Sequence, residues 1–423
     1  MVSSLAIFWG VSASAYQTEG YNRNQWTDWE RKYAEKRAAK SKHKSGRSDN
    51  RRCVNAEAKN PDNYVSGALA DHYHRYKEDF DLAKKMNMNA LRFSIEWSRI
   101  EPQEGVWNAE AITHYKDYID ELNRRGMEPI ITLFHFTLPV WFARKGGFEK
   151  RSNIKYFERF CQRVTKELCF GKYVKYIITI NEPEVYVTET YMGKNWPNSV
   201  RNPMKMWRAI NNLCLAHNLV ADAIHTTNPG CKVSIAKQPV FFSGSGSDDN
   251  FITRLVIKAA QYVQNDWILD KVVKHCDFLG INYYMSMKVD GFRISKSCSA
   301  GLSDLNWGLS PADIQFVLER MSNKYSLPIM VTENGLADAE DKNRQWWITQ
   351  TIAAMRKSVD NGVDLLGYLH WSLIDNFEWS YGKWPRFGLV AIDYTTGERK
   401  LRPSARWFGK FIRQQMEKDT PTA

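Results

Sequence analysis

Two spacings of apolar residues alternate along most of this chain. The first is the three-and-four spacing of one helix face, and it is set by Tyr76, Phe80, Ala83 and Met86. The stretch that follows, NALRFSIEW (89–97), alternates apolar and polar residues, which predicts a strand. Ile112–Arg125 again has helical spacing and stops at Gly126, and Pro129–Phe134 is a second short apolar strand. Helices and strands are therefore predicted to follow one another regularly.

The same exchange continues to the end of the chain. The predicted strands are Ala6–Val11, 89–97, Pro129–Phe134, Tyr176–Ile180, Lys232–Ala236, Phe278–Tyr283, Ile329–Thr332 and Leu365–Leu369. The predicted helices are His74–Met88, Ile112–Arg125, Ile154–Leu168, Met206–His225, Phe251–Lys274, Pro311–Tyr325 and Trp346–Asn361. Regular alternation predicts an α/β fold of parallel strands joined by right-handed crossovers.

Eight such units favour a closed (β/α)8 TIM barrel, formed as a single catalytic domain over residues 1–423. An open doubly wound sheet is the alternative, and it normally carries a glycine-rich phosphate loop after an early strand. The first predicted strand leads instead into SASAYQTEG. After residue 60 neither a low-complexity linker nor an internal repeat divides the chain, which also favours one domain.

The net charge of +12 lies mostly in one segment. Residues 31–59 contain eleven Lys or Arg and only three Asp or Glu. Within this segment, Lys36–Arg52 is nearly free of apolar residues, so residues 31–60 are interpreted as a basic insertion that forms a mobile surface loop. A tether to a polyanion or a membrane surface is the functional alternative. Because aromatic residues are not interleaved with the charges, a solvated insertion is favoured, and neither a nucleic-acid nor a membrane partner is expected.

The seven cysteines are odd in number, scattered, and form no C-x-x-C pair, which argues against a disulfide framework and against a zinc site. The first ten residues, MVSSLAIFWG, lack the charged region and the long apolar stretch of a signal peptide. No apolar run approaches the length of a membrane span. A cytoplasmic location is the resulting prediction.

Polar side chains follow the predicted strands, where the loops of a barrel build its active face. They are Gln17, Arg92, His135, Asn181, Glu182, Asn282, Tyr284, Glu333, Trp371, Glu378 and Trp379. Any one of them could be a helix cap or a satisfied turn residue. Together they predict a pocket lined by amides, carboxylates and indoles, which suits the hydroxyl edges and apolar faces of a sugar.

Two of these residues, Glu182 and Glu333, directly follow apolar strands. Glycoside hydrolysis needs two carboxyl groups across one cavity, one as an acid and the other to attack or to activate water. The alternative for either glutamate is a buried salt bridge with Arg92. Two such glutamates with sugar-binding neighbours favour catalysis.

These residues lie in motifs that resemble glycoside hydrolase family 1, the β-glucosidase and β-galactosidase family. The motifs are FWGVSASAYQTEG, DHYHRYKEDF, LRFSIEWSRIEPQEG, LFHFTLPVWF, TINEP, DFLGINYY, VTENG and GYLHWSLIDNFEWSYGKWPRFGL. In this order and spacing they cover nearly the whole chain. The resemblance implies a TIM barrel that hydrolyses terminal β-D-glucosides, with galactosides and fucosides as further candidate substrates, with retention and without a cofactor or a metal. A small β-glycoside or a short oligosaccharide is the implied partner.

The resemblance also implies roles for single residues. Glu182 matches the acid/base and Glu333 the nucleophile, with Arg92 and Tyr284 hydrogen-bonded to the nucleophile and Asn282 beside them. The residues that match the glycone site are Gln17, His135, Asn181, Glu378 and Trp379, with Trp371 as the platform beneath the sugar. Trp307 matches the aglycone-side tryptophan, and Phe387, in KWPRFGL, belongs to the same pocket. Burial and the charge of Glu333 are expected to raise the pKa of Glu182, and retention requires carboxyl groups about 5 to 5.5 Å apart.

Three positions depart from the family pattern. Phe136 replaces a tryptophan, Glu184 stands where an aromatic residue is frequent, and Lys383 replaces a tyrosine. The segment between Ala236 and Asp277 is also short, which predicts a lower wall around the leaving group. A 6-phospho-β-glycosidase is one alternative, which Lys383 favours and the retained Glu378-Trp379 pair disfavours. A non-catalytic sugar-binding homologue is the other, and the presence of both glutamates argues against it.

Overall fold

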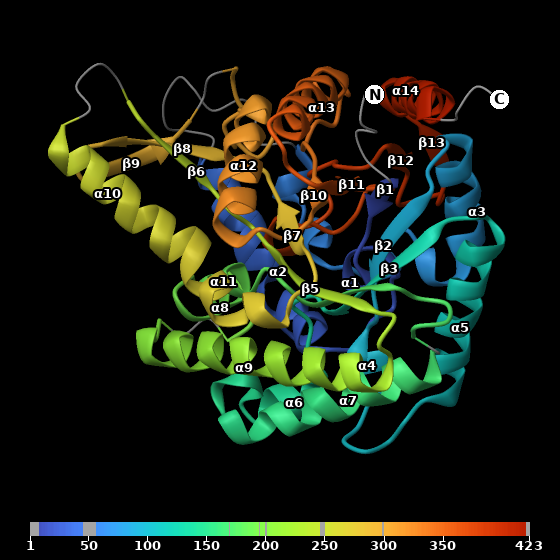
Figure 1. Cartoon of the computed structure of the whole chain (residues 1–423). Helices are drawn as coiled ribbons and strands as arrows, with labels where there is room; N and C mark the ends of the chain where they lie inside the picture. Colours follow the sequence, from blue (N-terminus) through green and yellow to red (C-terminus); the bar gives the residue numbers. More distant parts are fainter. Residues whose placement is uncertain are drawn as a thin grey trace.

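Eight parallel strands close into a barrel in the computed structural model (Figure 1). The structure describes residues 8–44, 56–168, 170–193, 195–198, 201–245, 250–297 and 300–419. The barrel strands are β1 (Phe8–Ser12), β2 (Ala90–Ser94), β3 (Glu128–Phe134), β4 (Tyr176–Asn181), β5 (Lys232–Lys237), β7 (Leu279–Asn282), β10 (Ile329–Asn334) and β11 (Leu365–Trp371). Each predicted strand is confirmed, with ends that differ by a few residues. Since β1 pairs with both β2 and β11, the sheet is closed and the open-sheet alternative is wrong.

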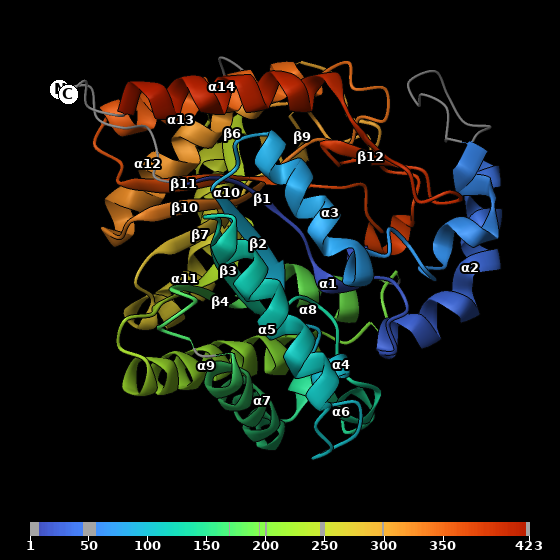
Figure 2. The ribbon, with the colours of Figure 1, turned by 90° about the vertical axis from the view of Figure 1, so that its right-hand side faces the viewer.

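Helices surround this barrel on its outer side (Figures 1 and 2). Those that follow barrel strands are α3 (His72–Lys85), α5 (Ala109–Arg124), α7 (Ile154–Glu167), α9 (Pro203–Thr227), α12 (Ile314–Tyr325), α13 (Arg344–Asp360) and α14 (Pro403–Asp419). Shorter helices in the loops are α1 (Ala15–Thr18), α4 (Trp97–Ile100), α6 (Val140–Arg144) and α8 (Pro183–Tyr191). Five further strands form two small sheets, β6 (Phe241–Gly244) with β8 (Ser286–Asp290) and β9 (Arg293–Lys296), and β12 (Val390–Ile392) with β13 (Arg399–Leu401).

One predicted helix, Phe251–Lys274, is wrong as a continuous element. It divides into α10 (Phe251–Gln261), a π-helical turn η5 (Tyr262–Asp266) and α11 (Trp267–Val272). The side chain of Asn265 in this turn is buried and exchanges two hydrogen bonds with the backbone of Val240, at 2.9 and 2.7 Å. The wider turn lets this polar side chain reach the loop after β5. π-helical turns inside α-helices are frequent at functional sites.

The barrel interior contains an apolar layer, and several strands place polar side chains directly beyond it. The apolar layer takes one residue from or beside each strand: Phe8, Ala90, Ile130, Ile178, Ala236, Phe278, Met330 and Leu369. Because side chains on a strand alternate, the next inward positions lie two residues further on, and they are polar at Arg92, Thr132 and Thr332. The apolar layer fills the barrel below, so the polar groups are held at its carboxyl-terminal end.

The first part of the basic insertion is helical, so its prediction as a loop is wrong there. Helix α2 (Gln25–Lys44) stands at one edge of the molecule in Figure 2. Ala34 and Ala38, one turn apart, are buried against Tyr64, while Trp26 and Trp29 near the start of the same helix pack into the main core. Small alanines supply the contact, which is why the apolar pattern along the segment is weak. Of the rest of the predicted loop, residues 45–55 lie outside the described residues, and η1 (Ala56–Lys59) is a 3-10 helical turn, so the loop prediction is wrong there too.

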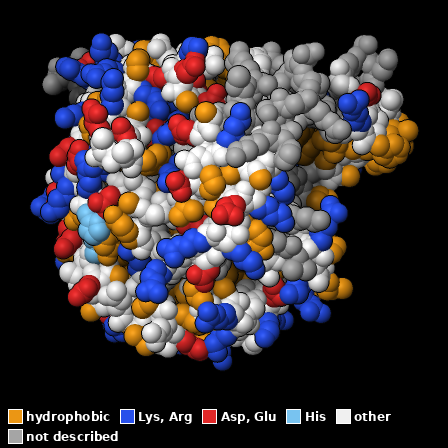
Figure 3. All heavy atoms as spheres, turned by 180° about the vertical axis from the view of Figure 1, so that it is seen from behind, with side chains coloured by type: hydrophobic (Ala, Val, Ile, Leu, Met, Phe, Trp, Pro, Cys, Tyr) orange, Lys and Arg blue, Asp and Glu red, His pale blue; other side chains and the backbone are white. Residues whose placement is uncertain are grey.

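Surface charge is mixed on the face shown in Figure 3, where Lys and Arg side chains are interspersed with Asp and Glu. In the parts of the chain that the structure describes, no helix is long and apolar enough to cross a membrane. The same residues contain no group of three or more His, Cys, Asp and Glu side chains that could hold a metal ion.

Gly335 is a position where packing permits no side chain. A Cβ built there would lie 1.8 Å from the carbonyl oxygen of Trp371, the last residue of β11. We expect Gly335→Ala to push β10 and β11 apart and to destabilise the protein by about 1–3 kcal/mol or more, measured as a lower Tm and reduced hydrolysis. Gly230→Ala is the matched control, because the nearest atom to its Cβ is 4.0 Å away. Equal Tm values for the two variants would contradict this prediction.

Candidate active site

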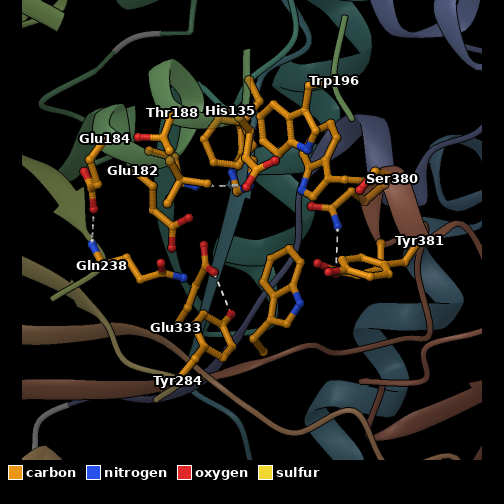
Figure 4. Close-up of a pocket in the computed structure, with 18 of the residues that line it drawn as sticks. His135, Glu182, Glu184, Thr188, Trp196, Gln238, Tyr284, Glu333, Ser380 and Tyr381 are labelled. Carbon is orange, nitrogen blue, oxygen red and sulfur yellow. Dashed lines mark hydrogen bonds between the residues drawn. The ribbon is translucent and has the colours of Figure 1, made fainter. Parts of the chain in front are cut away.

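One cavity, about 360 Å³ in volume, opens at the carboxyl-terminal ends of the strands (Figure 4). It brings together most of the predicted site residues, namely Gln17, His135, Asn181, Glu182, Tyr284, Trp307, Glu333, Trp371, Glu378, Trp379 and Phe387. The other two, Arg92 and Asn282, are fully buried and hydrogen-bonded to residues of its lining. Residues up to 370 positions apart in the sequence thus line one small space, which falls within the usual size range of ligand sites.

Glu333, in β10, is held by hydrogen bonds to both of its carboxylate oxygens. Arg92 donates to Oε1 through Nη1, and the hydroxyl of Tyr284 donates to Oε2 at 2.8 Å. The Arg92 guanidinium is itself fixed, because its Nε donates to Thr132 at 3.0 Å and its Nη2 to Asn181 Oδ1 at 2.6 Å. A buried guanidinium and a phenol thus contact the two oxygens of this carboxylate. The predicted contacts of Arg92 and Tyr284 with Glu333 are therefore present.

Glu182 lies just past β4 in a different environment. Its Oε1 accepts a hydrogen bond from Asn282 Nδ2 at 2.8 Å, and it has no cation of its own among the described residues. Burial raises the pKa of Glu182 well above its ordinary range, and the negative charges of Glu333 and Glu184 raise it further. The environment of Glu182 thus differs from that of Glu333, and a difference of this kind is how acid and base roles are separated between two carboxyl groups in one site.

Polar groups at the other end of the cavity surround Gln17 and Glu378. Gln17 Nε2 donates to the Phe377 carbonyl at 2.9 Å and approaches Glu378 Oε2 at 3.5 Å, which orients both side chains. Burial, followed by the charge of Glu333, raises the pKa of Glu378 to about 8. A carboxyl group held in this way is able to donate to or accept from a ligand hydroxyl.

His135 contacts two indoles in the same region. Its ring is stacked with those of Trp371 and Trp379, at centroid distances of 6.0 and 6.1 Å. Burial and the charge of Arg92 lower the pKa of His135 well below its ordinary value, so the imidazole is neutral. Asn181 Nδ2 lies 3.3 Å from Nε2 in donor position, which assigns the proton to Nδ1. Nδ1 is buried and has no hydrogen-bond partner among the described residues.

Three residues of the cavity have left-handed backbone conformations without being glycine. They are Phe136, Glu182 and Trp379, with φ values of 71°, 38° and 43°. Such conformations cost free energy and cluster at functional sites. The surrounding packing maintains them: the Trp379 ring is stacked on Tyr16 at 5.5 Å and contacts Trp196 at 5.4 Å.

Comparison with known proteins now identifies the family. A family model described as glycosyl hydrolase family 1 matches residues 5–274 and 258–417. The chain belongs to glycosyl hydrolase family 1. A β-glycosidase from Pyrococcus horikoshii has a similar structure, with 32% identity, a TM-score of 0.84, and coverage of 97% of this chain and 94% of that one. A bifunctional β-D-glucosidase/β-D-fucosidase from Bifidobacterium breve is 30% identical over 81% of this chain and 87% of its own.

A further relative is similar over most of its length. β-Glucosidase A of Thermotoga maritima is 28% identical, with coverage of 81% of this chain and 86% of its own. The predicted family, the TIM barrel and the glycoside hydrolase class are therefore confirmed, and the protein is a retaining β-glycosidase.

The departures from the family 1 pattern have different positions in the structure. Phe136 and Glu184 line the cavity. Lys383 does not: its amine lies 5.9 Å from the centre of the Tyr394 ring, and its backbone nitrogen donates to Asn63. Lys383 is thus placed beside Tyr394, outside the lining.

Sequence reasoning missed several residues that line or support the site. Gln238 directly follows β5 and lines the cavity, so the strand-end rule applied to the fifth strand would have found it. Gln264 comes from the π-helical turn, which the sequence pattern hid within a helix. Trp196 lies in a loop without a pattern of its own.

Arg37 is the most unexpected of these residues, because it belongs to the basic insertion. Its guanidinium lies 4.3 Å from the centre of the Trp29 ring and donates to the backbone carbonyls of Ser380 and Asn195. Ser380 follows Trp379 directly, so helix α2 braces the loop that carries this indole. Part of the basic insertion therefore supports the site.

Proposed function

We propose that this family 1 enzyme removes terminal β-D-glucosyl residues, with Glu333 as the nucleophile and Glu182 as the acid/base. The observation that supports these roles is the contrast between the two carboxyl groups. Glu333 receives hydrogen bonds from a cation and a phenol, whereas the pKa of Glu182 is raised by burial and by two nearby anions. Galactosyl and fucosyl residues are secondary candidates, since amide and carboxyl groups bind the hydroxyls of several epimers.

In the first step, a carboxylate oxygen of Glu333 attacks the anomeric carbon as the bond to the leaving group breaks. Glu182 gives its proton to the departing oxygen, so that the leaving group departs as a neutral alcohol. The product is a glycosyl ester on Glu333, whose negative charge has been used to form the bond. Because that charge raised the pKa of Glu182, its loss favours the ionised form of Glu182.

In the second step, the ionised Glu182 takes a proton from water, and the oxygen of that water attacks the anomeric carbon from the side that the leaving group left. Glu333 is released as a carboxylate and Glu182 is protonated again. Two inversions at one carbon give net retention. Arg92 and Tyr284 receive the returning negative charge in an arrangement that is already formed.

The glycone is proposed to lie over Trp371 and beside Trp379. Gln17, Glu378 and the Nδ1 proton of His135 would then bind its hydroxyl groups. Trp307 and Phe387 line the cavity as well and are assigned to the leaving-group side, with ring centroids 6.1 Å apart. We also propose that the chain acts as one catalytic domain in the cytoplasm, as suggested by the four cysteines that the structure describes, none of which forms a disulfide.

The 6-phosphate alternative is tested by comparing p-nitrophenyl β-D-glucoside with its 6-phosphate. The described lining contains no Lys or Arg but holds five glutamates: Glu182, Glu184, Glu189, Glu333 and Glu378. A phosphate dianion would be repelled there, so we expect kcat/KM to favour the unphosphorylated substrate by about 100-fold or more. A preference for the phosphate would overturn the proposed substrate. Activity on neither compound would favour the non-catalytic homologue.

A further inference from the structure

Helix α10 has apolar side chains on two faces, and the protein covers only one of them. The inner face packs against the small sheet of β6, β8 and β9 through Val256, Ile257 and Ala260. The outer face carries Phe251 and Leu255, which are 71% and 56% exposed. A surface helix normally turns polar residues to the solvent opposite its packed stripe, so this outer face is unusual.

The outer apolar face continues past both ends of the helix. At the first turn, the Thr253 hydroxyl accepts a hydrogen bond from the backbone nitrogen of Gly291 at 2.9 Å, which holds the turn between β8 and β9 against α10. Phe292 follows in that turn and is 83% exposed. At the other end, Tyr262 and Val263 of η5 are exposed. The α10 surface is defined here as Phe251, Ile252, Leu255, Tyr262, Val263, Phe292 and Ile294.

These side chains gather at a projecting edge of the molecule. Ile294 is paired with Val289, whose side chain packs against α10, so both point to the side of the sheet that this helix covers. Figure 1 places α10 at the left edge, and the view from behind in Figure 3 shows hydrophobic side chains on the projection at the right. Exposed apolar patches of this kind mark interaction sites.

The charged residues around the α10 surface are mostly basic. Those of α10 and of the hairpin formed by β8 and β9 are Arg254, Lys258, Lys288, Arg293 and Lys296, against the single acid Asp290. Asp248 and Asp249 precede the helix in the sequence and lie outside the described residues. The helix itself contains two basic residues and no acidic one. The partner of this surface should therefore be both apolar and anionic.

We propose that the α10 surface docks the enzyme on a lipid membrane with anionic headgroups. Helices that lie in a membrane interface combine Phe and Leu with Lys and Arg in this way. Contact between two copies of the surface would instead bring like charges together, which disfavours a dimer through this face. The cytoplasmic leaflet carries anionic lipids, and each basic residue near it strengthens binding about fivefold.

Docking would also place the active cavity close to the bilayer. Tyr262 and Val263, at one end of the α10 surface, directly precede Gln264, which lines that cavity. The apolar surface thus extends to within one residue of the cavity lining. The expectation that no membrane partner exists was based on the basic segment 31–59, which is a different part of the chain.

That basic segment supplies the competing explanation for any binding to anionic lipid. Its eleven basic and three acidic residues could hold the protein on a vesicle by charge alone. Such binding is screened by salt and does not depend on apolar side chains of α10. Substitutions on the α10 surface therefore separate the two explanations.

The test is sedimentation of the full chain with vesicles of phosphatidylcholine alone and of phosphatidylcholine mixed with phosphatidylglycerol, at physiological salt. We expect the parent to bind the mixed vesicles at least about tenfold more tightly. Phe251→Ser/Leu255→Ser should weaken that binding by about tenfold or more, because two apolar side chains no longer enter the interface. Arg254→Gln/Lys258→Gln should weaken it by about 25-fold, from fivefold for each charge.

The matched control is Met204→Ser/Trp207→Ser on α9, where the two side chains are 58% and 59% exposed. It should bind the mixed vesicles like the parent. All variants should keep the parental Tm and the parental rate on p-nitrophenyl β-D-glucoside, which shows that they fold.

Four outcomes would overturn the proposal. The first is a parent that binds neither kind of vesicle, and the second is parental binding by Phe251→Ser/Leu255→Ser, which would assign the contact to the basic segment. The third is an equal loss in the control pair. The fourth is a parent that sediments as a dimer without vesicles and becomes monomeric in Phe251→Ser/Leu255→Ser, which would assign the surface to a second copy of the chain.

Discussion

Glu333→Gln is expected to lower the hydrolysis of p-nitrophenyl β-D-glucoside by a factor on the order of 10⁴ or more. The amide cannot form the glycosyl ester, so the double displacement loses its first step. The variant keeps the shape of the side chain, and the Gln carbonyl is still able to accept from Arg92 or Tyr284, so the fold should remain. Initial rates under identical conditions give the factor.

The control for this variant is Glu417→Gln, which makes the same chemical change at an exposed ion pair with Arg413. It should retain parental activity. Glu333→Gln with the Tm of the parent and only a few-fold loss of rate would contradict the assignment of the nucleophile. Trapping the parent with a slowly hydrolysed fluorinated glucoside should add one glycosyl mass to the peptide that contains Glu333.

Glu182→Ala is expected to have an effect that depends on the leaving group. For cellobiose, whose alcohol needs a proton to depart, kcat/KM should fall by about 10²- to 10⁴-fold. For 2,4-dinitrophenyl β-D-glucoside, whose leaving group departs as a stable anion, the first step should change little. The second step lacks its base, so added azide, which needs no deprotonation to attack, should restore turnover and yield a β-glycosyl azide.

The pH profile supplies an independent readout of the same residue. Burial and the charges of Glu333 and Glu184 raise the pKa of Glu182, and the first step requires its protonated form. In the parent, kcat/KM is therefore retained below that pKa and is lost as the pH rises through it. Glu182→Ala should lack this alkaline limb. Equal losses on both glucosides, with the limb unchanged, would contradict the acid/base assignment.

The ion pair between Glu184 and Lys237 illustrates what sequence reasoning could and could not find. Glu184 was recognised as a departure from the family pattern. Its ion-pair partner, Lys237, could not be recognised, because it lies 53 residues away at the end of β5. Gln264 was hidden because a π-helical turn has no period that separates it from the α-helices on either side. Arg37 was assigned to a loop because the part of its helix inside the basic segment is buried only at two alanines, Ala34 and Ala38, which contribute little to an apolar pattern.

The sequence by itself determined the order of strands and helices and the residues that follow each strand. These features are local: a period of two or of three to four residues is set by neighbouring side chains, and a carboxylate that ends an apolar run is visible in the run. The closed barrel and the candidate pair Glu182 and Glu333 followed from such local evidence, and the family followed from the resemblance of the ordered motifs to family 1.

Only the tertiary structure decided which groups meet. Arg92 reaches Glu333 across 241 positions of sequence because both strands end at the same rim of a closed barrel. The raised pKa of Glu182, the neutral His135 and the unpaired oxygen of Glu184 likewise depend on burial and on charges brought in from other strands. Desolvation and Coulomb energy are set by distances in space, which barrel closure fixes and which spacing along the chain does not record.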